Sequence, residues 1–108
     1  MSSSAWKSEE RAVARLLGGT RYPANSGGRV DVEGPRVLAQ VKHRRVCSLA
    51  ELEGLALELE SLGRARGKLG LVIVKRRAGR GTPTPRLVVM TEDVYRRMRG
   101  SDADAEAA

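Results

Sequence analysis

Three polar residues between Arg29 and Arg45 are spaced so that they could do chemistry together: Asp31, Gln40 and Lys42. The composition of this stretch predicts two short strands joined by a tight turn at residues 33–35. Because side chains alternate along a strand, Gln40 and Lys42 share one face of the second strand. In the hairpin, the carboxylate of Asp31 is expected to point toward both of them. An acid, an amide and an ammonium are costly to bury together, so this face is a candidate functional site.

The same residues resemble the motif of the PD-(D/E)XK nuclease superfamily. In that family an Asp follows a turn, and an acidic residue, any residue and a Lys lie on the next strand; here the matching segments are Val30-Asp31 and Gln40-Val41-Lys42. The segments 6–11 and 18–27 sharpen the likeness to Holliday-junction resolvases of archaeal type and their phage-borne relatives. Val30 replaces the family's usual Pro, and Gln40 replaces its usual Glu. The motif covers the first half of the chain, and the second half is similar only in the order of its elements.

The resemblance implies an α/β fold, a small mixed central sheet flanked by helices, that is restriction-endonuclease-like in its order α-β-β-β-α-β-β-α. The length of 108 residues fits one domain. We expect a single nuclease-like domain over residues 1–99 and an acidic, disordered tail over residues 100–108. The family's activity would be a Mg²⁺-dependent endonuclease, with Mn²⁺ as a substitute, that acts as a homodimer on branched double-stranded DNA. Two identical sites could then make paired nicks across a four-way junction.

Hydrolysis of a phosphodiester needs a nucleophilic water and neutralisation of the charge that builds on the phosphate oxygens. Hard divalent cations supply both, and they prefer oxygen ligands. The resemblance implies that Lys42 orients the water and stabilises this charge, and that Ser26 lies near the scissile phosphate. The catalytic residues it implies are Glu10, Asp31, Gln40, Lys42 and Ser26. The metal ligands it implies are Glu10, Asp31, Gln40 and the carbonyl of Val41.

Two of these positions leave alternatives open. Helical spacing alone does not distinguish Glu9 from Glu10 on the first helix, and only the resemblance favours Glu10. Gln40 offers an amide oxygen but no charge. It is compatible with a natural active variant, with a naturally disabled binder, or with an engineered replacement of Glu. The corresponding functions are a junction resolvase, a less selective duplex nickase or restriction-type nuclease, and a non-catalytic DNA-binding module.

The charge balance favours a polyanionic partner. The formal net charge is +7 with a pI near 10.5, and nucleic acid is the preferred partner over a membrane surface. The aromatic fraction is only 3%, which argues against base-stacking recognition of single strands and favours contacts with a duplex backbone. No nucleotide cofactor is expected, because no glycine-rich phosphate loop is present. The predicted nucleic-acid contacts are Lys7, Arg11, Arg21, Arg29, His43, Arg44, Arg45, Lys75, Arg76, Arg77 and Arg80.

Local signals place the remaining elements. The first helix is expected to begin at the serines of residues 2–4 and to end near Leu17, and the second to begin at Ser48 and end before Gly67. The second helix bears a leucine stripe that includes Leu49. Strands are predicted over 21–24, 69–74 and 86–90, and a last helix from Thr91 to about residue 98. No apolar run reaches the roughly 18–20 residues of a membrane span, and no signal region is apparent, so a cytoplasmic location is expected.

Overall fold

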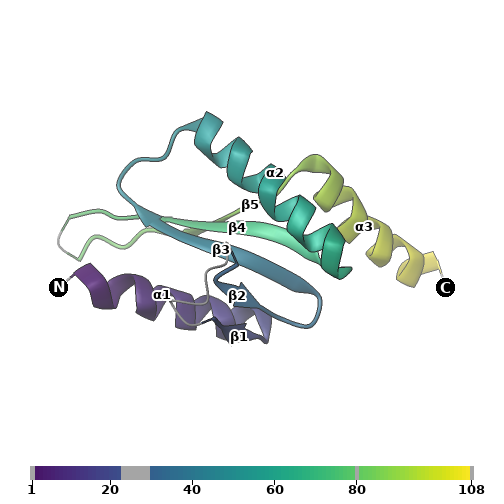
Figure 1. Ribbon diagram of the computed structural model, residues 1–108, viewed down its shortest axis with the longest axis horizontal. Helices are drawn as coiled ribbons and strands as arrows, with labels where there is room; N and C mark the ends of the chain where they lie inside the picture. Colours follow the sequence, from purple (N-terminus) through teal and green to yellow (C-terminus); the bar gives the residue numbers. More distant parts are fainter. Residues whose placement is uncertain (1, 23–29, 80, 108) are drawn as a thin grey trace.

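The computed structural model describes residues 2–22, 30–79 and 81–107. Within these residues the chain forms five strands and three helices (Figure 1). In chain order they are α1 (Ser2–Leu17), β1 (Thr20–Arg21), β2 (Val32–Glu33), β3 (Val37–Arg44), α2 (Leu49–Arg66), β4 (Leu69–Arg76), β5 (Arg86–Val89) and α3 (Glu92–Ala107).

The strands form one mixed sheet in the order β1-β2-β3-β4-β5. All neighbouring pairs are antiparallel except β3 and β4, which run parallel. A parallel pair needs a crossover connection, and α2 supplies it. Figure 1 shows α1 below the sheet and α2 above it, so both faces are covered. The predicted α/β class with a small mixed sheet flanked by helices is confirmed.

Each face of the sheet packs against its own apolar layer. Alternation along β3 sends Leu38 to the α2 side and Ala39 to the α1 side, and both side chains are fully buried. The layer under α2 contains Val30, Leu38, Ala56, Leu59, Val72 and Val74. The layer over α1 contains Val13, Ala14, Val32, Ala39 and Ile73. Strand β4 contributes to both layers, as its continuous apolar run predicted.

Helix α2 begins and ends where its capping residues predicted. The Ser48 hydroxyl accepts a hydrogen bond from the Glu51 N–H at 3.0 Å, and Gly67 ends the helix in the left-handed region at φ 67°. The helix lies so close to β4 that a Cβ at Gly70 would be 1.7 Å from the carbonyl oxygen of Leu59. One expectation for this helix is wrong: Leu49 is 81% exposed and lies outside the apolar stripe, because the first turn extends beyond the sheet (Figure 1).

Several other boundaries differ from the sequence expectations, including the ends of β4 and β5 by one or two residues. Strand β2 has only two residues, and β1 ends at Arg21. Thr91 caps α3 by accepting from the Val94 N–H at 3.2 Å, as predicted, but the helix continues past residue 98 to Ala107. The predicted disorder of residues 100–108 concerns the chain in solution and stays a prediction. No helix within the described residues is long and apolar enough to cross a bilayer.

Candidate active site

The second half of β3 has an open edge beside the short strand β2. The β2–β3 ladder pairs Glu33 with Leu38 and Val32 with Ala39, and it stops there. In an antiparallel pair the N–H and C=O of one residue point the same way, and every second residue faces the same neighbour. Val41 therefore presents both backbone groups to this edge. Among the described residues, the group that meets the Val41 N–H is a side chain: the Asp31 Oδ2, at 2.8 Å.

A β-bulge directs Asp31 to this edge. The Asp31 N–H donates to the Ala39 carbonyl at 2.9 Å, and the next residue, Val32, is paired with that same Ala39. Two consecutive residues thus face one residue of β3, which is the arrangement of a bulge. The core gives independent support: Val30 packs in the α2 layer and Val32 in the α1 layer, although regular alternation would place both on one face. The extra residue turns the Asp31 carboxylate toward the Val41 N–H.

The environment of Asp31 opposes its ionisation more than it supports it. Burial raises the pKa of Asp31 above its usual value, while the Val41 N–H, the Lys42 ammonium and the Arg21 guanidinium act in the opposite direction. The influence of Lys42 means that its charge lies within electrostatic reach of the carboxylate. This influence agrees with the predicted approach of an acid and an ammonium at the edge of the sheet, and their convergence stays a prediction.

The structure separates the two neighbouring acids of α1. Both are buried, but Glu9 is paired with Arg86 of β5, whereas Glu10 accepts from the Arg21 Nε at 2.7 Å. Burial raises the pKa of Glu10, the Arg21 hydrogen bond lowers it, and the negative charge of Asp31 raises it further. Only Glu10 therefore belongs to the cluster around Asp31, which agrees with the choice that the resemblance made.

Gln40 places an unsatisfied oxygen in the same half of β3. Its side chain is half-buried, and its Oε1 is buried without a hydrogen-bond partner in the described part of the chain. Buried acceptors in proteins are nearly always satisfied, so this oxygen is expected to bond to a water, an ion or a ligand. It does not bond to Asp31, and by strand alternation it leaves β3 on the opposite face from Val41.

The candidate metal ligands that the resemblance implies are all oxygens, which fits a hard divalent cation, although no contact in the described part of the chain places the Gln40 oxygen beside Asp31. Two carboxylates, one amide oxygen and one backbone carbonyl are available. Within the described residues no three Asp, Glu, His or Cys side chains gather as a metal site would require. The donor chemistry fits the cation, with less negative charge than a three-carboxylate site.

Parallel pairing gathers basic residues at one end of the sheet. His43 lies beside Lys75 and Arg44 beside Arg76 in the β3–β4 register, and Arg45 and Arg77 follow directly. Some of these groups are engaged within the chain: Arg44 pairs with Glu51, and the Lys75 Nζ donates to the Thr84 carbonyl at 2.7 Å.

The other predicted nucleic-acid contacts occupy different places. Lys7 and Arg11 are exposed on α1, where Lys7 precedes the Glu9-Glu10 pair in the chain and Arg11 follows it. Arg21 bonds to Glu10, so its guanidinium serves the acid cluster. Ser26, Arg29 and Arg80 lie outside the described residues.

Sequence reasoning missed how Asp31 and Glu10 are held. It assigned Arg21 to nucleic acid, whereas the structure pairs it with Glu10. The alternation of Val30, Asp31 and Val32 suggested a regular strand, and nothing in these three residue types indicates a bulge.

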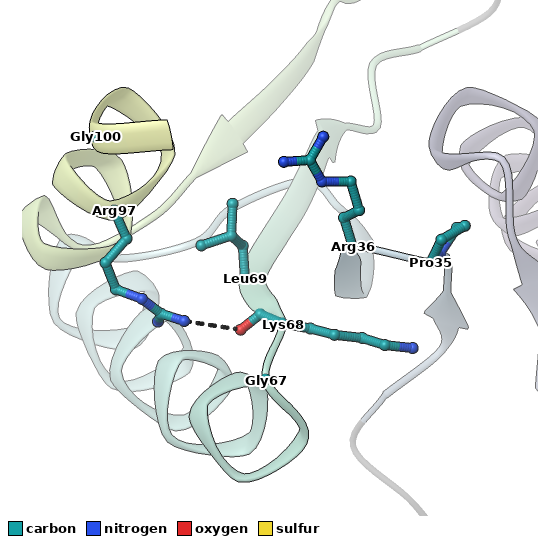
Figure 2. Close-up of a pocket in the computed structure, with 7 residues that line it drawn as sticks. All are labelled: Pro35, Arg36, Gly67, Lys68, Leu69, Arg97 and Gly100. Atoms are coloured by element: carbon teal, nitrogen blue, oxygen red, sulfur yellow. Dashed lines mark hydrogen bonds between the residues drawn. The ribbon is translucent and has the colours of Figure 1, made fainter. Parts of the chain in front are cut away.

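A hollow with a cavity volume of about 490 Å³ lies at the other end of the sheet. Arg36 precedes β3, whereas Lys42 lies near the opposite end of that strand, about 20 Å away at the rise of an extended chain. Figure 2 shows that the cations here do not converge: the Arg97 Nη2 donates to the Lys68 carbonyl at 3.5 Å, and the Lys68 ammonium extends to the far side. The hollow is separate from the Asp31 site. Its lining residues are Pro35, Arg36, Gly67, Lys68, Leu69, Arg97 and Gly100.

Comparison with protein-family models, with curated proteins and with solved structures found no match for this chain.

Proposed function

We propose that this protein is a metal-dependent DNA endonuclease that cleaves four-way junctions by paired nicks as a homodimer. The observation that supports it most is the Asp31 carboxylate on the Val41 N–H, within reach of the Lys42 charge, at the open edge of β3. The order of elements, α-β-β-β-α-β-β-α, is the one that the resemblance to the PD-(D/E)XK superfamily implies. The likeness to the restriction-endonuclease core is part of the proposal.

The residues of the site divide the work of phosphodiester hydrolysis. Asp31, Glu10, the Gln40 Oε1 and the Val41 carbonyl would hold Mg²⁺, or Mn²⁺ in its place. When bound, the ion supplies charge neutralisation at the phosphate and lowers the pKa of a ligated water. Lys42 orients the attacking water and stabilises negative charge on the phosphate oxygens. Hydrolysis joins the water oxygen to phosphorus and breaks one phosphorus–sugar oxygen bond, whose oxygen leaves with a proton.

The basic end of the sheet would hold the sugar-phosphate backbone. The carboxyl ends of β3 and β4 continue directly from Lys42 into the cluster of His43, Arg45, Arg76 and Arg77. Arginine guanidinium groups suit phosphate contacts, and such contacts provide affinity without sequence selection. This arrangement supports recognition of a duplex by its backbone and shape.

Gln40 supports a second candidate, a basic DNA-binding module that does not cut. With an amide at this position only two carboxylates serve the site, and no three-acid cluster forms in the described part of the chain. A less selective duplex nickase, with the same chemistry, is the alternative within the first candidate.

Incubation with labelled four-way junction and with matched linear duplex, in Mg²⁺ or in EDTA, tests these functions. Symmetric paired nicks on the junction that require Mg²⁺ support the resolvase. Equal cutting of linear duplex supports the nickase. Tight binding without cutting, both for the native chain and for Gln40→Glu, supports the binding module and contradicts the nuclease. Light scattering measures the dimer, and a monomer at the working concentration contradicts paired cutting.

A further inference from the structure

Two large apolar side chains project into solvent beside the basic end of the sheet. Val46 is 82% exposed and Leu49 is 81% exposed, the two highest values among the large apolar residues that the structure describes. Val46 lies in the connection from β3 to α2, and Leu49 is the first residue of α2. Neither is among the residues of the two hydrophobic layers. One exposed aliphatic side chain is ordinary, but two that lie three positions apart indicate a contact surface.

Hydrogen bonds and an ion pair hold this connection in place. The Glu51 N–H donates to the Ser48 hydroxyl at 3.0 Å, and the Glu51 carboxylate pairs with Arg44 at the end of β3. The Arg44 carbonyl accepts in turn from the Arg77 N–H at 2.8 Å. The backbone on both sides of Val46 is thus bonded to the sheet and to the helix. A partner would therefore have little chain to order when it binds the two apolar side chains.

The residues around the pair favour an anionic partner. Arg45 directly precedes Val46, and the register of β3 with β4 brings Arg44 and Arg76 side by side. Glu51 is the one acid between residues 43 and 52, and it is already paired with Arg44. Figure 1 shows the β3–α2 connection and the loop after β4 at the same end of the sheet. Arginines beside aliphatic groups complement DNA, which has phosphates outside and apolar base faces inside.

We propose that Val46 and Leu49 form an apolar wedge that enters DNA at the branch of a four-way junction. The inference rests on the proposed function and adds the residues that distinguish a branch from a linear duplex. DNA-binding proteins insert aliphatic side chains between base steps, and the separation of stacked bases costs free energy. That cost is lowest where pairing and stacking are already interrupted. The wedge therefore favours the branch, whereas the arginines beside it contact the phosphates of either substrate.

DNA labelled with 2-aminopurine, whose fluorescence rises when the base unstacks, tests this inference. The native chain and the double variant Val46→Thr, Leu49→Gln are titrated in EDTA, so that no strand is cut. The substrates are a junction labelled at its branch and a linear duplex with the same label. Both substitutions nearly keep side-chain size while they remove apolar character, and substitutions at exposed positions usually preserve folding. Leu16→Gln on α1 is the matched control, because Leu16 is 64% exposed.

The wedge has a different expected effect on each substrate. We expect the native chain to raise the fluorescence at the branch and to bind the junction about tenfold more tightly than the double variant does. This is the factor that partial burial of one large aliphatic side chain provides. Affinity for the linear duplex should stay within about twofold of native. Leu16→Gln should match the native chain on both substrates.

The outcomes separate the wedge from the proposed function. An unchanged signal at the branch, when the junction is saturated with native chain, overturns the wedge without recourse to a variant. Equal loss of affinity for junction and duplex in the double variant also overturns it. In both cases Mg²⁺-dependent nicking of the junction would leave the proposed function standing. Absence of native binding to either DNA overturns the proposed function, and the wedge with it.

Two further measurements compare the wedge with other uses of the same apolar pair. A lower mass of the double variant in light scattering would assign Val46 and Leu49 to an interface between copies. Loss of binding to phosphatidylserine vesicles, with junction affinity intact, would assign them to a lipid surface. Either result overturns the wedge.

Discussion

Asp31 and Glu33 are two carboxylates separated by one residue, yet they lie in opposite environments. Glu33 is surrounded by donors: the Lys68 ammonium, the Tyr22 hydroxyl and the Arg66 Nη1, the last at 2.6 Å. Its pKa is lowered by the hydrogen bonds from Lys68 and Tyr22 and by the charge of Arg66. Asp31 has one backbone donor, and burial raises its pKa.

The difference in environment favours a structural role for Glu33 and a ligand-binding role for Asp31. A carboxylate whose oxygens are all bonded to cations and hydroxyls ties elements together, and Glu33 joins β2 to the end of α2 and the start of β4. A desolvated carboxylate with few donors retains lone pairs for a ligand and costs stability to keep charged. The acid that the fold does not use for its own stability is therefore the better candidate for chemistry.

The largest expected effect is on cutting by Asp31→Asn. The asparagine oxygen can still accept from the Val41 N–H, so the edge of β3 should be preserved while the charge is lost. We expect the rate of nicking to fall by about a thousandfold, with affinity for junction DNA within a few-fold of native, because phosphate contacts dominate binding. Single-turnover cutting and gel-shift titration measure the two quantities. Loss of affinity without loss of cutting would reverse the assignment of Asp31.

Glu10→Gln and Glu9→Gln form a matched pair on α1. Glu10 lies with Asp31, and its substitution should lower nicking by about 10- to 100-fold, the usual range for a group that supports a metal site. Glu9 bonds to Arg86 on β5, and Glu9→Gln should leave cutting within a few-fold of native. Equal effects of the two substitutions on nicking would show that α1 contributes only to folding.

Glu33→Gln should affect stability and spare chemistry. The amide cannot balance Lys68 and Arg66, and the loss of charge-assisted hydrogen bonds should lower the free energy of unfolding by about 2 kcal/mol. Urea denaturation measures this change, and nicking below the unfolding transition should remain near native. A large defect in cutting with unchanged stability would place Glu33 in the site and remove the contrast with Asp31.

The smallest effect is on the pH dependence of stability, and its sign differs between the two acids. The folded-state pKa of Glu33 lies below its unfolded value of 4.5. Its contribution to the free energy of unfolding is therefore present above pH 4.5 and is lost as the pH falls through the folded-state pKa. The folded-state pKa of Asp31 lies above 3.8, so its ionisation destabilises the fold as pH rises through that folded value.

Urea denaturation between pH 3 and 7 measures how the free energy of unfolding changes with pH in the native chain and in the two variants. At pH 7 we expect Asp31→Asn to be at least as stable as the native chain and Glu33→Gln to be less stable. Both differences in free energy of unfolding between variant and native chain should shrink toward pH 3. The same sign for both variants at pH 7 would contradict the distinction between the two carboxylates.

The parts of the fold that could be predicted from the sequence depend on local signals. Ser48 and Gly67 bound α2 as their capping preferences indicate, and the apolar run of β4 gave a strand buried on both faces. The first turn of α2 differed because a leucine at helical spacing, Leu49, still needs a surface to cover it. The end of α3 near residue 98 was also wrong, because the helix continues through Gly100, a residue type that often ends helices but does not have to.

The sequence proposes which residues form the candidate site, and this stays a prediction; it did not indicate the contacts that hold Asp31 and Glu10 in place. The positions of Asp31 and Lys42 on adjacent segments follow from hairpin geometry. The bulge, the pairing of Arg21 with Glu10, and the separation of Glu9 toward Arg86 depend on contacts between distant segments. Pattern and spacing contain no information about which of several arginines approaches a given acid.

The bulge between Val30 and Val32 also has a consequence for how this protein could vary. Each valine anchors a different hydrophobic layer, so the backbone on both sides of residue 31 is fixed whatever side chain stands between them. The side chain at position 31 therefore belongs to neither hydrophobic layer, and its contact is with the backbone at the edge of β3. If Asp31 acts as proposed, evolution or design could exchange this acid while both anchoring valines stay in place.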